Sequence, residues 1–471
     1  MRKLVTAGGF SREHSIIVVF ALALSAALGI VPQRVQASGW YFTERGVRSL
    51  GRGGAFVAGA KGAESLWINP AGLKGSGNSF TMEGNLNFLR GSFQRLDDAG
   101  TVRAKEDVEI AYLPIPMFAV TKDFGLEDFS FGFGVYLPQF AVTSWPSQVN
   151  GGPAPNRYSL YSIKGSIFGN FTAGVAYHGI PGLSLGLTAA LITGRFKAST
   201  ALSACDGFLC VNPEDPTFDV TASITMRRFA SVMIGAGLIY DMGPVSIGAS
   251  LQPPWNMKGR TDLDVTLPSD PAFSQAKIEG TGGKMDVPFP WIGRVGVEVH
   301  PSESFRFELA AVYEGWSRQD EITVKANDMW IRDVIGIGDY QVGSIKIQRM
   351  MSDAYSFRGG FEYFMEDMGL TLRMGASYDT TAIKDKAMSP MTLDANKVVA
   401  GMGVTLHAGS VLDIDVLYGH VFMPDRQIRN SEIIQPTAIR PPQSAAAQSH
   451  IGNGTYTMES DFAGLGATFH F

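Results

Sequence analysis

Polar and apolar residues alternate along most of the chain, in segments of about ten residues. A period of two is typical of a β-strand that buries one face. Fourteen segments show it: 79–90, 107–120, 129–138, 166–178, 182–194, 227–240, 244–252, 291–300, 304–314, 354–366, 368–378, 396–408, 411–422 and 458–471. About ten residues is also what a tilted strand needs to cross a bilayer. We therefore predict an all-β fold, a transmembrane antiparallel β-barrel of about 14 strands.

The connections between these segments alternate between short and long. "HGIPG", "DMG", "PSE", "ED" and "AG" are brief, whereas the connections 139–165, 195–226, 253–290, 315–353 and 423–457 are long. Outer-membrane barrels have tight periplasmic turns at one rim and extended extracellular loops at the other. A soluble sandwich gives no reason for this rhythm, so the pattern favours the bacterial outer membrane.

The last segment supports the same location. In "DFAGLGATFHF" the residues Leu465, Phe469 and Phe471 are expected to face outward, and Thr468 and His470 inward. A terminal aromatic residue on such a strand resembles the signal that the outer-membrane assembly machinery reads, so we expect that machinery and outer-membrane lipid as partners. Closing the barrel also removes unpaired strand edges, which hydrocarbon cannot solvate.

The first residues have the features of a signal peptide. Arg2, Lys3 and Arg12 precede an apolar core at 16–30, and the small or aliphatic residues of "VQA" end at Ala37. The core is shorter than the ~20 residues that a membrane-spanning helix needs. We expect cleavage after Ala37, which gives a signal peptide at 1–37, an N-terminal segment at 38–78 and a barrel at 79–471.

Within the N-terminal segment, "SLGRGGAFVAGAKGAESLWINPAGL" at 49–73 is apolar but shows neither strand alternation nor a clean helical stripe. Its glycines allow close approach of the backbone. At its end, Asn69 and Pro70 are suited to setting a turn, because proline fixes φ and asparagine can hydrogen-bond nearby backbone.

Composition fits a membrane barrel and argues against several other classes. The chain is 45% hydrophobic with 55 glycines and only 18% charged residues, against about 25% in soluble domains. Its net charge of -5 comes with no basic run, so it offers no electrostatic surface for nucleic acid. The two cysteines, Cys205 and Cys210, lie in a turn-rich segment and are expected to form a local disulfide outside the reducing cytosol.

Catalytic and metal motifs are absent from the sequence. "GRGG" at 51–54 has no following Gly-Lys-Ser/Thr, the histidines form no His-x-x-x-His pair, and no Gly-x-Ser-x-Gly occurs. No further Cys or His stands near the cysteines at ligand spacing. We therefore expect no enzyme activity, no metal and no cofactor.

Four consecutive strands carry charges of both signs on the face predicted to line the lumen. The arginines there are Arg294, Arg306, Arg358 and Arg373, and acids such as Glu298, Glu308 and Asp415 share that face. An unpaired guanidinium would match a substrate carboxylate. Equally, the charges can pair with one another across strands and stiffen the wall.

Several segments together resemble the outer-membrane long-chain fatty acid transporter family, the FadL family, which includes importers of aromatic hydrocarbons. The resemblance rests on the small-residue segment ending in Asn69, Pro70 and Ala71, and on "MDVPFPWIGRVGVEV", "FELAAVYEGWSRQDEI", "DAYSFRGGFEYF" and "MGASYDTTAIKDKAMSPMTLDANKVVAGMGV". It runs from about residue 39 to the end.

The resemblance implies that residues 38–78 form a hatch that plugs a 14-stranded barrel, with Asn69, Pro70 and Ala71 at the gate. It also implies diffusive uptake of long-chain fatty acids or other hydrophobic small molecules by a monomer. Release would occur sideways at a kink in the third strand, where Gly132 and Gly134 stand. Candidate capture residues, expected to be exposed on long loops, are Phe208, Leu209, Trp255 and Met257. A general porin or a structural or adhesive barrel is the alternative.

Overall fold

The computed structural model describes residues 45–109, 112–137, 144–205, 207–436 and 448–471. The expected signal peptide at 1–37, with its cleavage site, and the first residues of the expected hatch lie outside the described residues. Among the described residues, no helix is long and apolar enough to cross a membrane.

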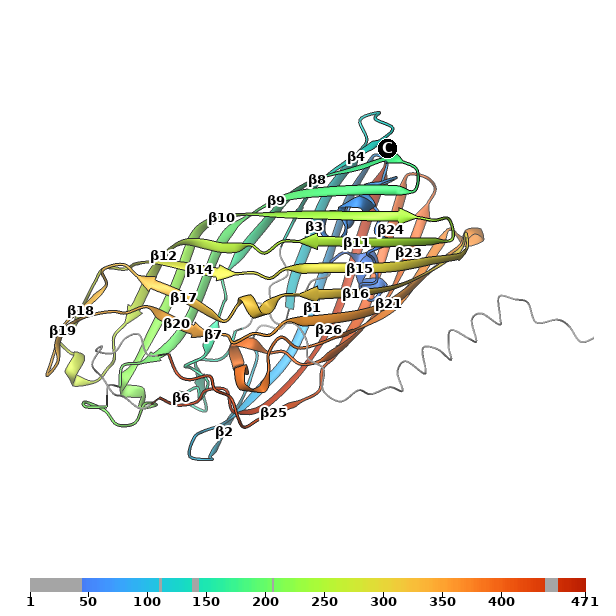
Figure 1. Cartoon of the computed structure of the whole chain (residues 1–471). Helices are drawn as coiled ribbons and strands as arrows, with labels where there is room; N and C mark the ends of the chain where they lie inside the picture. Colours follow the sequence, from blue (N-terminus) through green and yellow to red (C-terminus); the bar gives the residue numbers. More distant parts are fainter. Residues whose placement is uncertain (1–44, 110–111, 138–143, 206, 437–447) are drawn as a thin grey trace, which may run out of the picture. The chain divides into compact units, whose positions relative to one another are not determined.

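The described strands form a closed antiparallel barrel of 14 strands (Figure 1). In ring order these are β1 (Ser79–Leu96), β3 (Tyr112–Lys122), β4 (Phe129–Tyr136), β8 (Ile167–Ile180), β9 (Leu183–Ser203), β10 (Asp219–Asp241), β11 (Val245–Gln252), β15 (Ile292–Ser302), β16 (Phe305–Glu314), β21 (Ala354–Met365), β22 (Leu370–Asp379), β23 (Lys397–Ala408), β24 (Leu412–Phe422) and β26 (Gly454–His470). The ring closes because β1 pairs with β26 on one side and with β3 on the other. The predicted strand number is confirmed.

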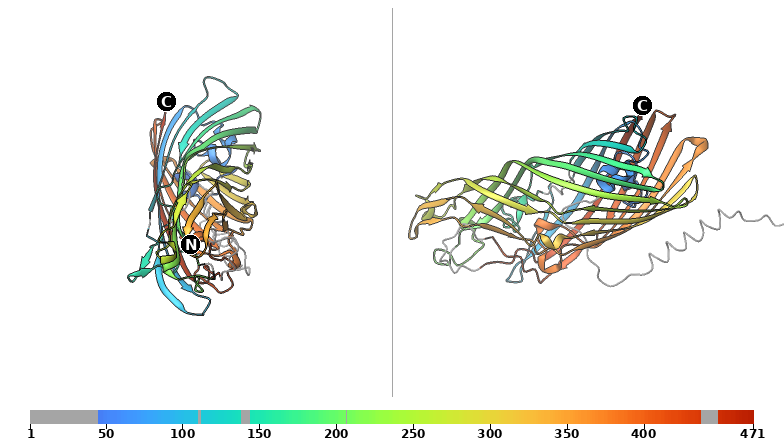
Figure 2. Two further views of the ribbon diagram at one scale, coloured as in Figure 1. Left: turned by 90° about the vertical axis from the view of Figure 1, so that its left-hand side faces the viewer. Right: turned by 45° about the horizontal axis from the view of Figure 1, so that its top comes forward.

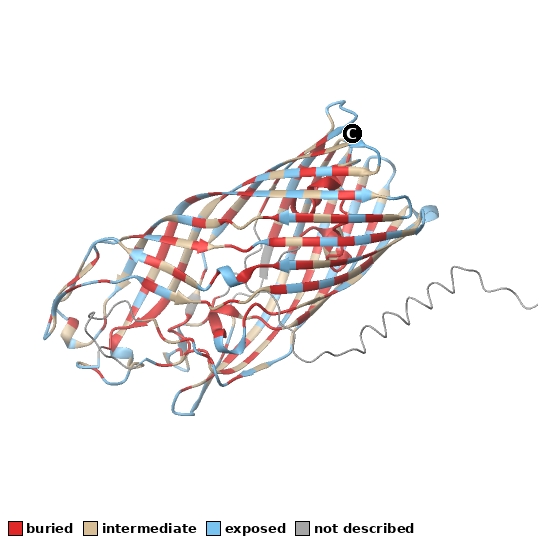
Figure 3. Cartoon of the chain, in the orientation of Figure 1, coloured by how far each residue is buried: buried red, intermediate tan, exposed pale blue. Residues whose placement is uncertain are grey.

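Strand faces alternate as the sequence pattern predicts (Figure 3). On β26, Leu465 and Phe469 are exposed on the outer face, whereas Thr468 and Gly466 between them are buried. Because successive side chains of a strand point to opposite faces, the apolar residues form an outer band and the small and polar residues line the lumen.

Much of what the sequence analysis expected to be long loop is strand. β9 and β10 continue beyond the predicted segments and pair from Asp219↔Ser203 to Tyr240↔Leu183. Further strands extend the barrel at the same rim: β2 (Val102–Asp107), β7 (Leu160–Ser162), β12 (Asn256–Thr266), β14 (Gly282–Pro288), β17 (Glu321–Ala326), β20 (Ile345–Gln348) and β25 (Arg426–Ile428). This end, at the left of Figure 1, is called the long-connection rim, and the opposite end the short-turn rim.

Small elements complete the long-connection rim. Two short sheets consist of β5 (Gln148–Val149) with β6 (Gly152–Pro153), and of β13 (Lys277–Glu279), β18 (Trp330–Val334) and β19 (Gly338–Gln341). Single turns of 3₁₀-helix are η2 (Pro216–Phe218), η3 (Pro271–Phe273), η4 (Trp316–Arg318), η6 (Asp385–Ala387) and η7 (Pro390–Thr392), whereas η5 (Glu366–Met368) lies in the short turn between β21 and β22.

Candidate functional site: the hatch and the lumenal wall

Residues 45–78 lie inside the barrel and form the hatch (Figure 2). They contain α2 (Val47–Gly51), α3 (Ser65–Ile68) and η1 (Pro70–Leu73) and contribute no strand. α2 contacts β22, β23 and β24, whereas η1 contacts β8, β9 and β10 on the other side of the ring. The segment is almost wholly buried, which explains why its sequence is apolar without a strand period.

Glycines of the wall allow the hatch backbone to approach closely. A Cβ added at Gly375 would stand 2.1 Å from the carbonyl oxygen of Arg52, and one at Gly401 would stand 2.1 Å from that of Leu50. At Gly186 an added Cβ would stand 2.2 Å from the backbone nitrogen of Ala71. Only glycine allows such contact without displacing backbone, so these positions of the wall are shaped to hold the hatch.

Arg52 of the hatch lies among three carboxylates of the wall. Its guanidinium stands 3.3 Å from Glu308 and 3.7 Å from both Glu298 and Glu362. The side chains of Arg52, Glu298 and Glu308 are fully buried. Breaking one partner of a buried ion pair is strongly destabilising, because a charge is left unpaired. This cluster is therefore a fully buried ionic attachment of the hatch to the wall.

Glu308 also receives three backbone N–H groups of the hatch. Its carboxylate oxygens accept hydrogen bonds from Val57 at 2.6 Å, Ala58 at 3.0 Å and Gly59 at 2.9 Å. Hydrogen bonds to a charged acceptor are about twice as strong as neutral ones. One lumenal carboxylate thus fixes both Arg52 and the loop that follows it.

A second ionic attachment joins α2 to β24. Arg48 stands 2.9 Å from Asp413 and 3.1 Å from Asp415. Within the hatch, Glu64 accepts the backbone N–H groups of Arg48 and Ser49, each at 2.9 Å. Glu64 therefore joins two parts of the hatch, whereas Arg48 joins the hatch to the wall.

The four predicted lumenal arginines have different surroundings. Arg373 continues the ionic network, at 2.5 Å from Glu362 and 3.5 Å from Asp415. Arg358 donates to the carbonyl oxygen of Gly54 at 3.2 Å, so it holds the hatch as well. Arg294 is buried in the wall. Arg306 is half-buried and, in the described part of the chain, no carboxylate lies within 4.0 Å of it.

The motif residues Asn69, Pro70 and Ala71 contact the opposite wall. The amide of Asn69 donates to the carbonyl oxygen of Val57 at 2.8 Å and to that of Leu238 in β10 at 3.1 Å. Its side-chain oxygen accepts the N–H of Ala71 at 3.3 Å and so caps η1, which starts at Pro70. The carbonyl of Ala71 accepts from Ser184 of β9 at 2.8 Å.

Gly132 and Gly134 of β4 face hatch leucines. A Cβ added at Gly132 would stand 2.9 Å from Leu73 and 3.0 Å from Leu66, and one at Gly134 would stand 3.1 Å from Leu66. The ladder between β3 and β4 runs from Lys122↔Phe131 and stops at Met117↔Tyr136. At Gly132 and Gly134 the wall and the hatch therefore touch, and the lateral opening at this strand stays a prediction.

The predicted capture residues fall into two groups. Phe208 is 80% exposed at the long-connection rim, and Leu209 is partly buried against the core. Trp255 and Met257 were expected on an exposed loop, but they are only 6% and 3% exposed. Pro253 and Pro254 interrupt the strand between β11 and β12, and the Trp255 indole stacks on Phe289 with ring centroids 4.1 Å apart. Met257 lies in β12 rather than in a loop.

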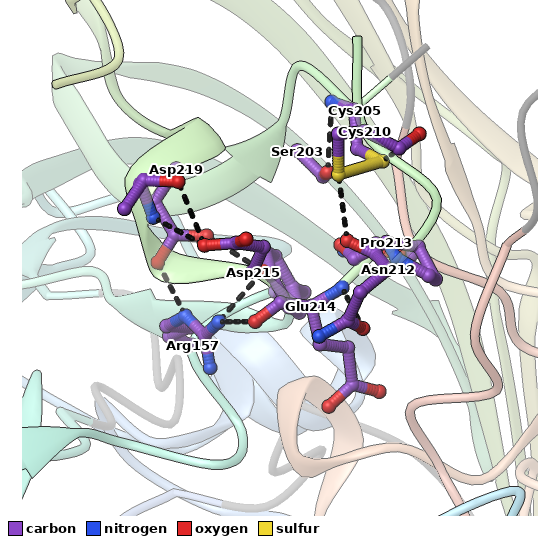
Figure 4. The surroundings of a disulfide bond; sticks show 12 residues. Arg157, Ser203, Cys205, Cys210, Asn212, Pro213, Glu214, Asp215 and Asp219 are labelled. Atoms are coloured by element: carbon purple, nitrogen blue, oxygen red, sulfur yellow. Dashed lines mark hydrogen bonds and ion pairs between the residues drawn. A yellow bond between two sulfur atoms is a disulfide. The ribbon is translucent and has the colours of Figure 1, made fainter. Parts of the chain in front are cut away.

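The long-connection rim is held together by covalent and ionic links. Cys205 and Cys210 form a disulfide with Cα atoms 5.1 Å apart (Figure 4). In the same region Arg157 stands 2.5 Å from Asp219 and donates to the carbonyl oxygen of Glu214 at 2.7 Å. The disulfide closes a local loop, whereas the contacts of Arg157 join two connections that are distant in sequence. The rim is therefore structured, and we call the region that it encloses the vestibule.

Glu106 of β2 provides a pH-sensitive contact in this vestibule. It accepts the N–H of Asn156 at 3.0 Å. Burial raises the pKa of its carboxyl from the ordinary 4.5 to about 8, although the Asn156 N–H opposes the rise. Below pH 4.5 the group is protonated whether the loop is docked or not. As pH rises toward 8, only the undocked form ionises readily, so docking of the loop weakens.

We expect limited proteolysis of the loop around Asn156 to be faster at pH 9 than at pH 5 by about tenfold or more, since one pKa unit corresponds to a factor of ten. Glu106→Gln keeps an acceptor and removes the ionisation, so its cleavage rate should not change over this range. Equal pH dependence in the variant would rule out Glu106 as the titrating group.

Sequence reasoning missed the hatch residues Arg48, Arg52 and Glu64. The sequence signal was the presence of charged residues in a segment that otherwise consists of small and apolar residues. Buried charges require partners. The hatch arginines could therefore have been expected to pair with acids on the lumenal wall, as the structure shows.

Comparisons with known proteins agree with this architecture. The model of the family described as "Outer membrane protein transport protein (OMPP1/FadL/TodX)" matches residues 28–471. No curated protein matches the sequence. A Pseudomonas aeruginosa FadL homologue of known structure superposes with a TM-score of 0.73 at 14% identity, covering 92% of this chain and 100% of that one.

Two toluene transporters of known structure have the same fold. The P. putida transporter TodX gives a TM-score of 0.65 at 14% identity, with 91% of this chain and 99% of that chain covered. The Ralstonia pickettii transporter TbuX gives 0.59 at 15% identity, with the same coverage of 91% and 99%. These likenesses show the fold, whereas the family match extends over nearly the whole chain, and the chain belongs to the OMPP1/FadL/TodX family of non-enzymatic outer-membrane channels for hydrophobic compounds.

Proposed function

We propose that this protein takes up long-chain fatty acids, by capture in the vestibule, movement of the hatch and sideways release through the wall at β4. The observation that carries the proposal is the way in which the hatch is attached. Polar contacts at Arg52, Arg48 and Asn69 hold it against a wall of glycines. Such polar contacts can exchange partners when the hatch moves, and apolar hatch residues such as Leu66 and Trp67 pack into the core of the barrel at the same time.

The vestibule supports a hydrophobic ligand. Its walls contain buried aromatic pairs, including Phe93 stacked on Tyr456 with ring centroids 4.5 Å apart and Trp255 stacked on Phe289. A greasy solute gains little from a water-filled pore, so its path requires apolar surface. A general porin has no need for the hatch.

Two cations favour a ligand with a carboxylate. Arg306 of β16 and Lys61 of the hatch lie within electrostatic range of each other. Neither has a carboxylate within 4.0 Å among the described residues, unlike Arg52, Arg48 and Arg373. Glu362 lies within electrostatic range of both cations but is already paired with Arg373, so it neutralises them only in part. A guanidinium binds a further carboxylate in bidentate fashion. A fatty acid supplies that anion and an apolar chain together.

We expect Arg306→Ala to slow uptake of labelled oleate by roughly tenfold, from loss of a charge-assisted contact, and to leave toluene uptake unchanged. Proteoliposomes with purified protein provide the measurement. Lys74→Ala is the matched control, because Lys74 is a hatch cation already paired with Asp241 at 3.0 Å. Equal loss of oleate and toluene uptake would assign Arg306 a structural role.

The same vesicles separate this function from the alternatives. If small sugars pass rapidly in liposome swelling while oleate uptake matches empty vesicles, the protein is a general porin. If neither solute passes, it is a structural or adhesive barrel. If toluene enters and oleate does not, the channel transports hydrocarbons and the proposed substrate class is wrong.

A further inference from the structure

The outer surface of the barrel carries three cations that stand side by side on neighbouring strands. Arg260 of β12 is the ladder partner of Lys284 of β14, and Lys284 is the ladder partner of Lys325 of β17. All three are exposed, and we call them the cation row. Among the described residues, no carboxylate lies within 4.0 Å of any of them. Like charges directly opposite on a sheet are destabilising.

Neighbouring cations on these and adjacent strands are paired with acids. Lys258 stands 2.9 Å from Asp286, and Lys346 stands 3.2 Å from Glu321. Arg227 of β10 pairs with Asp262. Acids are therefore present on this surface, but among the described residues they pair with the flanking cations and not with the cation row. The row therefore presents three neighbouring positive charges on the outer surface.

The basic surface continues around the barrel. Arg195 of β9 and Arg228 of β10 are exposed, and neither has a carboxylate within 4.0 Å among the described residues. They meet where the ladder between β9 and β10 shifts register, at Met226/Phe229. The cation row itself covers two strand spacings, about 10 Å at the usual 4.7–4.9 Å between strands. A head group whose two phosphates are separated by a disaccharide extends over that distance and can contact all three cations.

An apolar groove lies on the same side of the barrel, toward the short-turn rim. It has a volume of about 750 Å³ and crosses the outer faces of β9, β10, β11, β15, β16 and β21. Small outward residues such as Ala236, Ala249 and Ala311 form its floor, and large ones such as Leu187 and Phe357 form its sides. Tyr313 and Tyr355 line it as well, and such aromatic residues favour the level where hydrocarbon meets head groups.

We propose that this face binds a lipid of the outer leaflet that bears several phosphates and several acyl chains, the lipid A part of lipopolysaccharide. Its phosphates contact the cation row, and one acyl chain lies in the groove. Charge complementarity and the order of the two features, cations beyond the apolar band and groove within it, fit this occupant. The proposal concerns the outer wall and is independent of the lumen, the hatch and the transported substrate.

Retention of lipid A by the detergent-purified full chain tests the proposal. Bisphosphorylated hexa-acyl lipid A is added, and native mass spectrometry measures the bound fraction. We expect R260Q/K284Q/K325Q to retain on the order of tenfold less than the unaltered protein, because each basic residue near an anionic head group contributes to binding. The control K105Q/K164Q/K277Q removes the same charge from exposed positions elsewhere and should retain lipid A normally.

Two further measurements identify the occupant. Phosphatidylglycerol should be retained less than bisphosphorylated lipid A, and equal retention of the two would overturn the assignment to a multiply phosphorylated lipid. Ala249→Phe fills the groove from the lipid-facing side and should weaken lipid A retention. If retention is unchanged, no acyl chain binds in the groove. Equal retention by the row variant and the unaltered protein would reject the site. Heat-modifiable migration in electrophoresis checks that each variant is a folded barrel.

Discussion

Replacing Arg52 by methionine should loosen the hatch while the barrel still assembles. The substitution keeps much of the side-chain length but leaves Glu298, Glu308 and Glu362 without their shared cation. Removing one partner of a buried ion pair costs about 3–5 kcal/mol. The loss of free energy weakens binding of the hatch to the wall, because the wall strands retain their own hydrogen-bonded ladders. We expect faster hydrogen exchange at the amides of Val57 and Gly59, and a higher single-channel conductance in planar bilayers.

Two variants make the Arg52 result interpretable. Arg52→Lys keeps the charge but lacks the planar fork, so its conductance should lie between those of the unaltered protein and Arg52→Met. Lys74→Ala removes an exposed hatch pair, which contributes about 0–1 kcal/mol, and should behave as the unaltered protein does. If Arg52→Met exchanges and conducts like the unaltered protein, the cluster does not hold the hatch.

The barrel could be predicted from the sequence because a membrane strand must satisfy a local rule. Each strand faces lipid on one side, so alternation is imposed residue by residue and is readable in segments such as 291–300, which the structure places in β15. Strand number then follows from counting. Closure follows because hydrocarbon leaves no place for an unpaired edge.

Beyond the apolar band the same rule no longer applies, and prediction failed there. β12 and β14 lie beyond the apolar band and do not face hydrocarbon, so their outward residues, such as Lys258 and Lys284, are charged. These stretches therefore looked like loop. The burial of Trp255 depends on Phe289, a residue of the neighbouring connection, and no local pattern encodes that pairing.

The hatch was located from its sequence, but its attachments were not. Its glycines and alanines indicated close approach, and the structure shows that the glycines of the wall, such as Gly375 and Gly401, matter as much. The sequence predicted that the lumenal charges either pair with one another or bind ligand. It did not predict that they pair with charges of the hatch. Arg48 and Arg52 from the hatch complete networks that the wall alone leaves acidic.

Asn69→Ala should uncouple the hatch from the opposite wall and change hydrophobic uptake without reducing barrel assembly. Alanine leaves the carbonyls of Val57 and Leu238 and the N–H of Ala71 without this partner. A buried polar group left unsatisfied costs about 1–3 kcal/mol, so the closed arrangement loses stability in several contacts at once. Oleate uptake in proteoliposomes should change severalfold, and amide exchange of η1 should accelerate.

The sign of the uptake change tells which step the hatch limits. Faster uptake means that Asn69 restrains an opening motion, and slower uptake means that it positions the hatch for ligand transfer. Asn69→Asp should perturb η1 at least as strongly, because it keeps the acceptor for Ala71 but places a carboxylate against two carbonyl oxygens. Ser250→Ala, which removes only the 2.6 Å hydrogen bond to the carbonyl of Ile68, is the milder control on the same wall. Loss of heat-modifiable barrel in Asn69→Ala would instead make the motif a requirement for assembly, and the hatch would then be part of the folding core rather than a gate.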